Sequence, residues 1–266
     1  MKIAVYNCTY NPEISPLVHF GCELVKETIA QQLERVGHSY YFIPWQHCKS
    51  GKYTITDDTD LVLVNGEGSW HSNKRKDMLD IAIKYPCVMF NTVYQNNSYS
   101  AESLNKFKGI YTRESMSAAA VKSDGGIAKV IPDIILTNKN ILNRSKSLTT
   151  NHGHIDHYDG IKTLQRYKPF LDQLESFSHI ASGSYHGALV CAMLDIPFSM
   201  WPSNTHKMIA LASDMGVQNI HCANKLAAIS SIPKTLSDSV KEYVADGQNK
   251  INAFGIELIA ANLFAQ

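Results

Sequence analysis

The sequence has little of what would assign it to a specialised class of protein. Its 266 residues carry 25 lysines and arginines against 24 acidic residues, so the formal net charge is only +1. This balance excludes a general electrostatic attraction to nucleic acid or to anionic membranes, although it allows a local basic surface. With 44% hydrophobic and 18% charged residues, and with no internal repeat or low-complexity tract, the composition is that of an ordinary globular protein.

Paired cysteines and long apolar runs are also missing from the sequence. The six cysteines form no CxxC pair, and several stand within apolar runs, which favours reduced, buried thiols over disulfides. No apolar run approaches the roughly 20 residues that a membrane-spanning helix needs. The first residues, MKIAVYN, have the pattern of a strand rather than of a signal peptide. We therefore expect a cytoplasmic protein without membrane association.

Short β-type runs alternate with helical segments along the first half of the chain. Apolar residues at helical spacing predict helices over residues 23–36, 78–83 and 115–121. This alternation indicates a parallel sheet with helices on both faces. The predicted strands cover residues 2–7, 39–44, 61–65, 87–93, 109–112 and 129–134.

A polar stretch at residues 138–146, NKNILNRSK, separates this half from a second, smaller α/β unit. The tail at residues 237–264 carries two amphipathic stretches that meet near Gly247. We therefore divide the chain into a Rossmann-like domain (1–138), a smaller Rossmann-like domain (139–236) and a helical segment (237–266) that crosses back to the first domain. In the second unit, strands are predicted at 148–151, 179–182, 197–201 and 217–221, and helices at 160–177, 187–194 and 206–215.

Ligands of open α/β sheets bind outside the carboxyl ends of the strands, and three polar turns follow predicted strands here. The first turn, NGEGSWH (65–71), comes directly after the apolar run LVLV. Its glycines let a ligand approach the backbone, and Glu67 and His71 offer a carboxylate and an imidazole. Either group suits general-base catalysis on an acceptor hydroxyl. The alternative is a plain strand–helix turn capped by Ser69.

The second turn, SGSYHG (182–187), precedes a predicted helix. Backbone N–H groups and the dipole of that helix would suit a phosphate or a diphosphate, to which His186 could add a charge-assisted contact. The alternative for His186 is a helix cap or a packed ring. A third polar turn, SNTHK (203–207), follows an adjacent predicted strand. The second and third turns are therefore expected to border one crevice, which favours a functional role for both.

The third turn is SNTHK (203–207), after the strand predicted at 197–201. We expect Ser203 to cap the next helix, and Lys207 to lie inside that helix and reach an anion or a ribose. A capped surface helix with a solvated lysine is the alternative.

A histidine-rich segment, NHGHIDHYDG (151–160), brings three imidazoles close to Asp156 and Asp159. Imidazoles and carboxylates are zinc ligands, but this spacing is not that of a standard zinc site. We expect a polar loop that contributes His154 to the donor site, with no bound metal and no cofactor.

Two further groups of residues are candidates for binding an acceptor. Gly21, Cys22 and Glu23 open the first predicted helix, where the Gly21 turn would face the crevice. A basic strip able to contact DNA phosphates is predicted from residues that follow the first turn and from a later segment. Its members are Lys74, Arg75, Lys76, Lys106, Lys108 and Arg113.

Taken in order, these segments resemble the polysaccharide pyruvyl transferase superfamily over residues 1–216. The resemblance implies a GT-B-like fold, with two Rossmann-like domains whose parallel sheets face each other across a cleft and a C-terminal helix packed back on the first domain. It also implies a donor mainly on the second domain and an acceptor mainly on the first. The matching segments are Gly21-Cys22-Glu23, the strand with NGEGSWH, Arg113-Glu114-Ser115, the strand with Pro132-Asp133, SGxYHG, the Pro-Phe strand and SNTxK.

Two positions depart from the family pattern: Cys22 stands where Asp is frequent, and Ser184 stands where Arg is frequent. Phosphoenolpyruvate presents a phosphate and a carboxylate, both of which suit bidentate guanidinium contacts. Without that arginine, the sequence favours a nucleotide sugar held by backbone amides, His186 and Lys207. The superfamily also includes short, phage-type glycosyltransferases, some acting on hydroxymethylated DNA bases, and the compact second domain fits that branch.

We therefore expect a glycosyltransferase that moves a sugar from a nucleotide-activated donor to a hydroxyl on a glycan or on a hydroxymethylated DNA base. The alternatives are a phosphoenolpyruvate-dependent pyruvyl transferase, with cations from Arg113, Arg144 or Arg166, and a non-catalytic sugar-nucleotide-binding module. The expected catalytic residues are Glu67 and His71. The expected donor site comprises Ser182, Gly183, Ser184, Tyr185, His186, Ser203, Asn204, Lys207 and His154, and the expected acceptor site comprises Gly21, Glu23, Asn65, Arg75 and Arg113.

Overall fold

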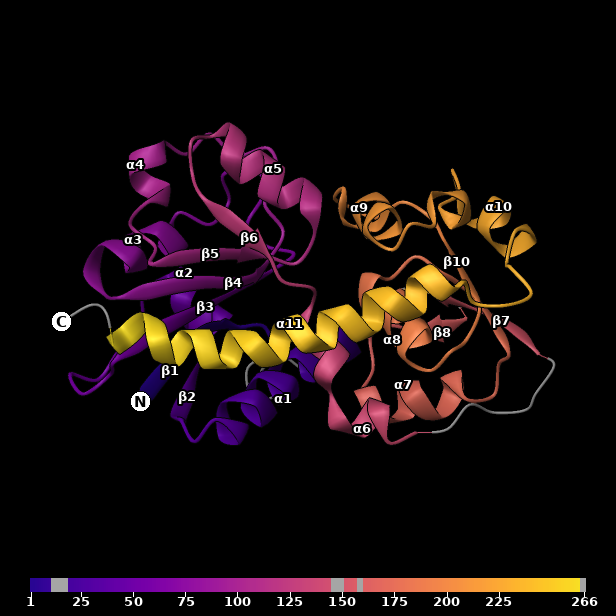
Figure 1. Ribbon diagram of the computed structural model, residues 1–266, viewed down its shortest axis with the longest axis horizontal. Coiled ribbons are helices and arrows are strands. Elements are labelled where there is room, and N and C mark those ends of the chain that lie inside the picture. Colours follow the sequence, from indigo (N-terminus) through magenta and orange to yellow (C-terminus); the bar gives the residue numbers. More distant parts are fainter. Residues whose placement is uncertain (11–18, 145–150, 157–159, 264–266) are drawn as a thin grey trace. The chain divides into compact units, whose positions relative to one another are not determined.

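The computed structural model describes residues 1–10, 19–144, 151–156 and 160–263. The chain divides into two compact units, the first made of Met1–Ile14, Ile29–Ile134 and Lys250–Gln266, and the second of Ser15–Thr28 and Ile135–Asn249. Helix α1 (Phe20–Arg35) and helix α11 (Asp238–Leu263), both labelled in Figure 1, each have one part in the first unit and one part in the second. The division at 134/135 lies close to the predicted boundary at 138, but the start of α1 belongs to the second unit.

In the first unit, the described residues form a six-stranded parallel sheet in the order β2-β1-β3-β4-β5-β6. The chain leaves β1 toward β2 on one side and continues from β3 toward β6 on the other, so the connections change direction between β1 and β3. Such a switch point is where open α/β sheets bind ligands. The strands are β1 (Lys2–Cys8), β2 (Ser39–Pro44), β3 (Leu61–Glu67), β4 (Cys87–Thr92), β5 (Gly109–Thr112) and β6 (Ala128–Val130).

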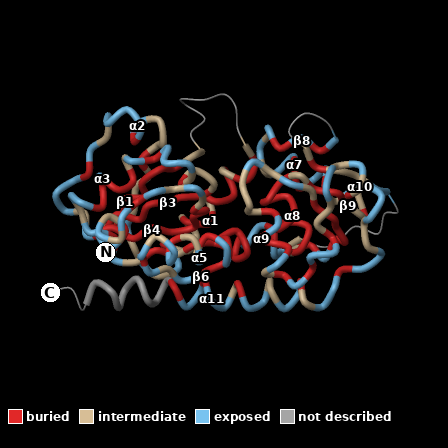
Figure 2. The backbone as a smooth tube through the Cα atoms, turned by 90° about the horizontal axis from the view of Figure 1, so that it is seen from above, coloured by how far each residue is buried: buried red, intermediate tan, exposed pale blue. Residues whose placement is uncertain are grey.

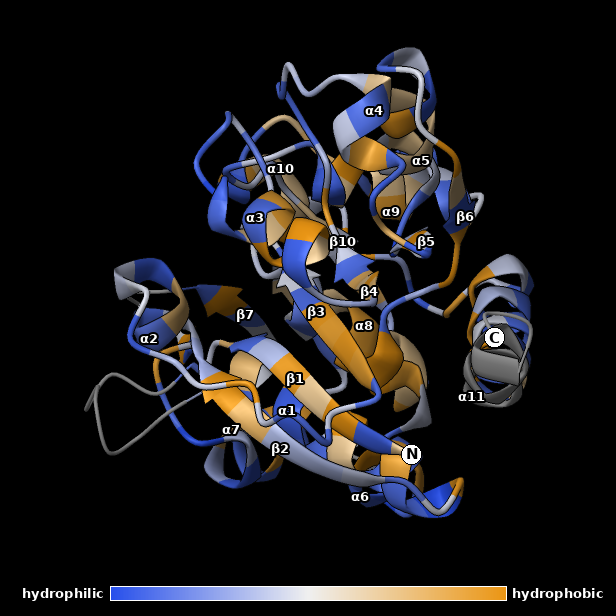
Figure 3. Cartoon of the chain, turned by 90° about the vertical axis from the view of Figure 1, so that its left-hand side faces the viewer, coloured by the Kyte–Doolittle hydropathy of each residue, from blue (hydrophilic) through white to orange (hydrophobic). Residues whose placement is uncertain are grey.

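The central strands of this sheet are apolar and buried on both faces, as strands of a covered parallel sheet must be. Figure 2 shows β3 and β4 in the colour of buried residues, and Figure 3 shows β3 as hydrophobic over most of its length. On one face, Tyr6, Val64 and Met89 belong to a core cluster that also includes side chains from all the helices of this unit except α1 and α11. These helices are α2 (Trp45–Ser50), α3 (Asp77–Lys84), α4 (Ala101–Leu104) and α5 (Ser115–Ser123).

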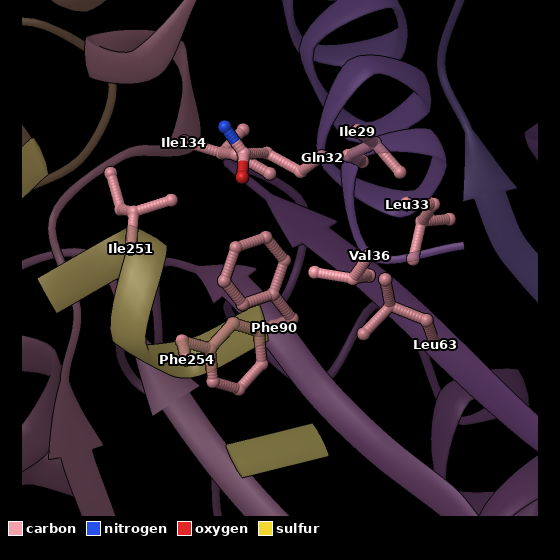
Figure 4. A pocket seen from close by; sticks show the side chains of 9 residues that line it. All are labelled: Ile29, Gln32, Leu33, Val36, Leu63, Phe90, Ile134, Ile251 and Phe254. Carbon is pink, nitrogen blue, oxygen red and sulfur yellow. The ribbon is translucent and has the colours of Figure 1, made fainter. Parts of the chain in front are cut away.

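The opposite face of the sheet packs against the second part of α1 and the part of α11 that belongs to this unit. The ring of Phe254 on α11 stacks on that of Phe90 on β4, with centroids 4.8 Å apart, and lies 4.6 Å from the ring of Tyr111. Figure 4 shows the two phenylalanine rings beside Ile251 of α11 and the apolar side chains of α1. A single helix runs through Gly247, where the sequence had indicated the junction of two stretches.

The second unit contains a four-stranded parallel sheet in the order β10-β9-β7-β8 within the described residues. Its connections change direction between β7 and β9, which gives this unit a switch point of its own. The strands are β7 (His152–Asp156), β8 (Ile161–Lys162), β9 (His179–Ser182) and β10 (Phe198–Met200). The helices are α6 (Lys139–Leu142), α7 (Tyr167–Leu174), α8 (Tyr185–Met193), α9 (Lys207–Asp214) and α10 (Lys225–Ser230), with 3-10 turns η1 (Ile134–Thr137) and η2 (Gln218–Ile220).

All six strands and all three helices predicted in the first half are present, with boundaries shifted by a few residues, whereas α2 and α4 were not predicted. The mixed α/β class with parallel sheets is therefore confirmed. Predictions in the second half were less accurate. The strand predicted at 148–151 lies mostly outside the described residues, and β7 instead covers the histidine segment that we had interpreted as a loop. The polar stretch at 138–146 contains α6, whose first turn is capped by Asn138.

Two further predictions for the second half were wrong in type. The segment 160–177 is helical only from Tyr167 to Leu174, because Gly160 adopts a left-handed φ of 63° and Ile161–Lys162 form β8. The strand predicted at 217–221 is the 3-10 turn η2, followed by a single bridge between His221 and Met200. Among the described residues, no helix is long and apolar enough to cross a membrane.

The packing of α11 on the first sheet predicts a large stability effect at Phe254. Phe254→Ala should lower the free energy of unfolding by about 3–5 kcal/mol, because it removes a buried aromatic ring. Ile127→Ala, at a side chain that is 81% exposed, is the control and should change it by less than about 0.5 kcal/mol. Urea denaturation of both variants checks this, and equal, small effects would show that α11 does not contribute to the core of this unit.

Candidate functional site

Glu67 lies at the switch point of the first sheet, as the last residue of β3. The strand continues two residues beyond the predicted end, so Gly66 and Glu67 belong to β3 itself and not to a following turn. The side chain is 6% exposed, and Oε1 accepts hydrogen bonds from Thr9 Oγ1 (2.5 Å) and from Asn65 Nδ2 (2.8 Å). These two donors fix the orientation of the carboxylate at the sheet edge.

The rest of the predicted turn folds locally. A side chain at Gly66 would overlap that of Thr92 on the neighbouring strand, so the glycine is needed for close pairing of β3 and β4. Ser69 Oγ donates to the Gly66 carbonyl oxygen (2.9 Å) and caps no helix, because the next helix begins only at Asp77. His71 is partly exposed, forms a single bridge to Gln95, and its Nδ1 lies 3.3 Å from Ser72 Oγ.

Arg75 does not belong to an exposed basic strip, contrary to our expectation. Its side chain is buried, and Nε and Nη2 donate to both carboxylate oxygens of Asp77 at 2.8 and 2.7 Å. Nη1 donates to Asn7 Oδ1 at 2.6 Å, and the Asn7 amide in turn donates to the Asn65 carbonyl oxygen at 2.5 Å. The guanidinium therefore holds Asn7 in place, and Asn7 in turn holds Asn65 beside Glu67. With all these contacts made inside the protein, it is not available to DNA phosphates.

Two further groups close this network. The hydroxyl of Tyr6 donates to Asp77 Oδ2 (3.1 Å), and burial raises its pKa, so the phenol stays protonated. The Cys48 sulfur accepts a hydrogen bond from the backbone N–H of Asn7 at 3.3 Å. Burial raises the pKa of the Cys48 thiol to about 11, so this cysteine serves as a neutral packing group and not as a nucleophile.

Arg113 and its neighbours are also structural. Arg113 is 2% exposed, and its Nη1 lies 3.0 Å from Oδ2 of Asp133, which is completely buried. Glu114 caps helix α5 by accepting from the backbone N–H of Ser117 at 2.8 Å, and it also accepts from the Ser117 hydroxyl. The Arg-Glu-Ser and Pro-Asp segments thus form one buried ion pair and one helix cap, and the expected acceptor contact of Arg113 is not supported.

In the second unit, the turn after β9 forms the start of helix α8. Ser182 is completely buried, and its Oγ donates to the Ser184 carbonyl oxygen (2.9 Å). Ser184, at the position where the family often has arginine, is the N-cap of α8 and accepts from the Gly187 N–H at 3.3 Å. Gly183 lies against the indole of Trp201, because a side chain there would overlap that ring. Tyr185 and His186 occupy the first turn of α8, both buried.

Gly21 and Glu23 were expected on the acceptor side, but the structure places both in the second unit. A side chain at Gly21 would overlap the imidazole of His186, so this glycine lets the start of α1 approach the start of α8. The His19 ring lies 6.5 Å from that of His186, and its Nδ1 accepts from the Gly21 N–H at 3.1 Å. Two helix N-termini and two imidazoles therefore meet beside the β7/β9 switch point.

Glu23 has a structural role in the same unit. Its Oε1 lies 2.5 Å from Nε of Arg166, and its Oε2 accepts from the backbone N–H of Tyr167 at 2.7 Å. The first N–H groups of a helix have no partner within the helix, and the N-cap residue Arg166 gives α7 no side-chain cap. The bond from Tyr167 to Glu23 supplies a partner for one of these N–H groups. The carboxylate of Glu23 thus determines where α7 begins and is already engaged by two donors.

The third turn follows β10, which pairs with β9 in parallel, so the prediction that both turns follow adjacent strands is confirmed. Ser203 does not cap α9, contrary to our prediction: its hydroxyl donates to Asn204 Oδ1 (3.1 Å), and the N-cap position is occupied by His206. Lys207 is the first residue of α9, and its Nζ donates to Asn204 Oδ1 (3.0 Å).

The histidine segment is a strand and not the loop that we predicted. His154 lies inside β7, opposite Ala181 of β9, and the ring of His152 stacks on His179 at 4.6 Å. Asp156 forms an ion pair with Lys225 at 3.2 Å. Among the described residues, no group of three His, Cys, Asp or Glu side chains is placed to hold a metal ion. His157 and Asp159 lie outside the described residues.

Two asparagines at the first switch point were not singled out from the sequence. Asn7 and Asn91 are completely buried, are the second-last residues of β1 and β4, and have left-handed φ angles of 67° and 52°. Each follows an apolar strand run, and Asn is among the few residues that tolerate this conformation. The combination of an apolar run and a terminal asparagine was therefore a usable signal.

The structural interpretation of Arg75 predicts a large effect on stability. Arg75→Leu should lower the free energy of unfolding by about 1.5–3 kcal/mol, because it removes the charged hydrogen-bond partner of the half-buried Asp77 carboxylate and of the buried Asn7 amide. Lys76→Ala changes the exposed neighbouring cation and should have an effect below about 0.5 kcal/mol. Urea denaturation measures both values. Similar small effects would instead place Arg75 on the surface with its neighbours.

Comparison with known proteins supports the fold. No protein-family model matches the chain, and no curated protein matches it. Among solved structures, an uncharacterized protein from Klebsiella pneumoniae is similar, with a TM-score of 0.60 and 12% sequence identity, over 84% of this chain and 93% of that chain. At this level of identity the similarity concerns the fold alone, which is an α/β fold with parallel sheets.

Proposed function

We propose that the protein is a GT-B-type glycosyltransferase that moves a sugar from a nucleotide-activated donor to a hydroxyl group of a glycan. In this proposal the first unit binds the acceptor and the second unit binds the donor. The observation that carries the proposal is the position of Glu67, a buried carboxylate at the carboxyl edge of the first sheet and at its switch point. A carboxylate held there suits a general base.

The start of α8 supports a donor site in the second unit. It lies at the carboxyl end of β9, next to the β7/β9 switch point, where backbone N–H groups and the helix dipole favour a diphosphate. His186 occupies the first turn of that helix, and the start of α1 reaches it at Gly21. Because both helices begin at this position, the positive ends of two dipoles would act on the same anion.

Lys207 supports the same assignment through an electrostatic argument. A cation in the first turn of a helix opposes the helix dipole, which is unfavourable by about 0.3–1 kcal/mol. Lys207 nevertheless begins α9, directly after the strand that pairs with β9. A diphosphate between the starts of α8 and α9 would reverse the sign of this interaction and account for the lysine.

The proposed transfer involves one proton and two bonds. The acceptor hydroxyl oxygen attacks the anomeric carbon of the donor sugar, and the bond from that carbon to the diphosphate oxygen breaks. Glu67 takes the hydroxyl proton, while Thr9 and Asn65 keep its carboxylate oriented. The helix N-termini, His186 and Lys207 would stabilise the negative charge that develops on the leaving nucleoside diphosphate.

A glycan acceptor is favoured over DNA because two arginines of the predicted basic strip are buried in ion pairs. Arg75 is held by Asp77, and Arg113 by Asp133. Pyruvyl transfer from phosphoenolpyruvate is disfavoured for a related reason, because it requires cations for two anionic groups. Arg144 is paired with Asp172 and Glu175, and Arg166 is paired with Glu23.

A thermal-shift panel tests the proposed donor. Nucleotide sugars and nucleoside diphosphates should raise the melting temperature, since a ligand that binds only the folded state stabilises it, whereas phosphoenolpyruvate should not. Lys207→Ala should weaken nucleotide binding by about 1.5–3 kcal/mol in titration calorimetry. Lys241→Ala, which removes an exposed lysine paired with Asp195, is the control and should bind normally. A shift with phosphoenolpyruvate alone would favour pyruvyl transfer.

Glu67→Gln tests the proposed base. Glutamine keeps an oxygen acceptor for Thr9 and Asn65 but cannot take a proton at neutral pH. Nucleotide binding should persist, while release of nucleoside diphosphate from the donor identified by the panel should slow by about 10²–10⁴-fold. His71→Ala, measured in parallel, tests the nearest competitor for the role. A lower melting temperature with an unchanged rate per folded molecule would make Glu67 a structural residue and favour a non-catalytic module.

A further inference from the structure

Trp201 lies at the carboxyl edge of the second sheet, directly after β10. Its backbone N–H donates to the carbonyl oxygen of Ser182 at 3.2 Å, which ties the residue to the end of β9. Its indole packs through Nε1, Cε2 and Cζ2 against Gly183, the residue before the N-cap of α8. This tryptophan therefore lies beside the turn that begins α8.

The glycine at position 183 makes room for this indole. Gly183 is not among the glycines with a left-handed φ, so its backbone conformation would accept other residues. A side chain there would overlap the indole, however, and the contact therefore depends on glycine. Gly183 and Trp201 are both partly exposed, whereas Ser182 and Ser184 on either side of the glycine are buried. The contact thus lies where solvent and a ligand can reach it.

The other two tryptophans of the chain use their rings for contacts within the protein. Trp70 is completely buried among three further aromatic rings. Trp45 has Nζ of Lys49 at 5.7 Å from its ring centroid. Within the part of the chain that the structure describes, neither an aromatic ring nor a cation stacks on Trp201. Its partly exposed indole therefore offers a surface on which a planar group of a ligand can stack.

The residues next to this indole favour a flat partner over a sugar ring. Pro202 follows it in the chain, and Gly183, which packs against it, has no side chain. Ser203 Oγ donates to Asn204 Oδ1, which also accepts from Lys207 Nζ, so the next polar side chains bond to one another. A sugar ring would need partners for several hydroxyl groups, whereas a nucleobase can stack through its π-face alone.

We propose that the indole of Trp201 stacks on the base of the nucleotide whose diphosphate binds at the start of α8. A nucleoside diphosphate continues from its phosphates through the ribose to a flat base, so a ring packed on the turn before α8 suits the base. The inference rests on the proposed function for the diphosphate and adds the residue that holds the other end of the nucleotide. Because every nucleobase has a π-face, the contact gives affinity for nucleotides without selecting one base.

Trp201→Leu tests this contact, because leucine keeps an apolar side chain and removes the π-face. The probes are the diphosphates of adenosine, guanosine, cytidine, uridine and thymidine, and inorganic pyrophosphate, which carries the anionic group without a base. In titration calorimetry, at least one nucleoside diphosphate should bind the wild type more tightly than pyrophosphate does. Trp201→Leu should weaken that binding about 5- to 150-fold, equivalent to about 1–3 kcal/mol for one stacked base, and leave pyrophosphate binding unchanged. Trp201→Phe, which keeps a smaller ring, should have a smaller effect.

Trp45→Leu is the matched control, because it changes another partly exposed tryptophan, which belongs to the first unit. It should leave the binding of every probe unchanged.

Fluorescence gives a second readout that requires no change at position 201. Trp45→Phe leaves two tryptophans, of which Trp70 is completely buried, so changes in emission on binding report mainly on Trp201. Nucleoside diphosphates should quench this emission, and pyrophosphate should not, because only a base can stack on the indole.

Three results would overturn the inference. Equal losses of affinity for pyrophosphate and for nucleoside diphosphates in Trp201→Leu would make the indole a structural cover for the start of α8. Unchanged affinity for every probe would show that the indole contacts no ligand. Quenching by nucleotide sugars but not by nucleoside diphosphates would place the sugar ring on the indole instead of the base.

The stacking contact and the proposed function fail in different experiments. Nucleotide binding that is independent of Trp201 contradicts only the stacking contact. Nucleotide binding that depends on Trp201, without any release of nucleoside diphosphate from nucleotide sugars, contradicts the proposed transferase and leaves the stacking contact standing. Absence of binding of every probe to the wild type contradicts the proposed donor site and the stacking contact together.

Discussion

The carboxyl edge of the first sheet depends on the buried guanidinium of Arg75. A buried charge is stable only when its partners are placed well, and Arg75 meets this condition through both oxygens of Asp77 and the amide oxygen of Asn7. The Asn7 amide donates to the backbone carbonyl of Asn65, and the Asn65 amide donates to the carboxylate of Glu67. The orientation of the proposed base is thus determined by a chain of hydrogen bonds that begins at an ion pair.

In the second unit, one carboxylate likewise joins two parts of the fold through hydrogen bonds. Glu23, near the start of α1, supplies the acceptor that the first turn of α7 lacks, and its other oxygen holds Arg166. Phe20, one turn earlier, stacks on Phe170 of α7 with ring centroids 3.7 Å apart. These contacts anchor the start of α1 in this unit, and from there Gly21 can lie against His186. A short segment far away in sequence thereby completes the proposed anion site.

Stability and the proposed function oppose each other at the first switch point. The left-handed residues Asn7, Glu67 and Asn91 destabilise the fold, while the apolar strands β3 and β4 and the stacking of Phe254 on Phe90 stabilise it. In this sheet the left-handed residues lie in the last two positions of their strands, at the edge where the strands end. This distribution is typical of sites built on a rigid sheet, where the scaffold tolerates local backbone strain.

The sequence by itself determined the alternation of strands and helices in the first half, because apolar periodicity reports burial directly. It also placed Glu67 directly after a strand, in a turn whose first residues are the end of β3 in the structure. It could not determine the partners of charged groups: Arg75 and Arg113 looked like surface cations, and only the fold brings Asn7 to Arg75 and Asp133 to Arg113. The polar histidine segment became strand β7 because pairing with β9 outweighs its composition. Periodicity is a local property of the chain, whereas compensation of charge and pairing of strands depend on residues that only the tertiary structure brings together.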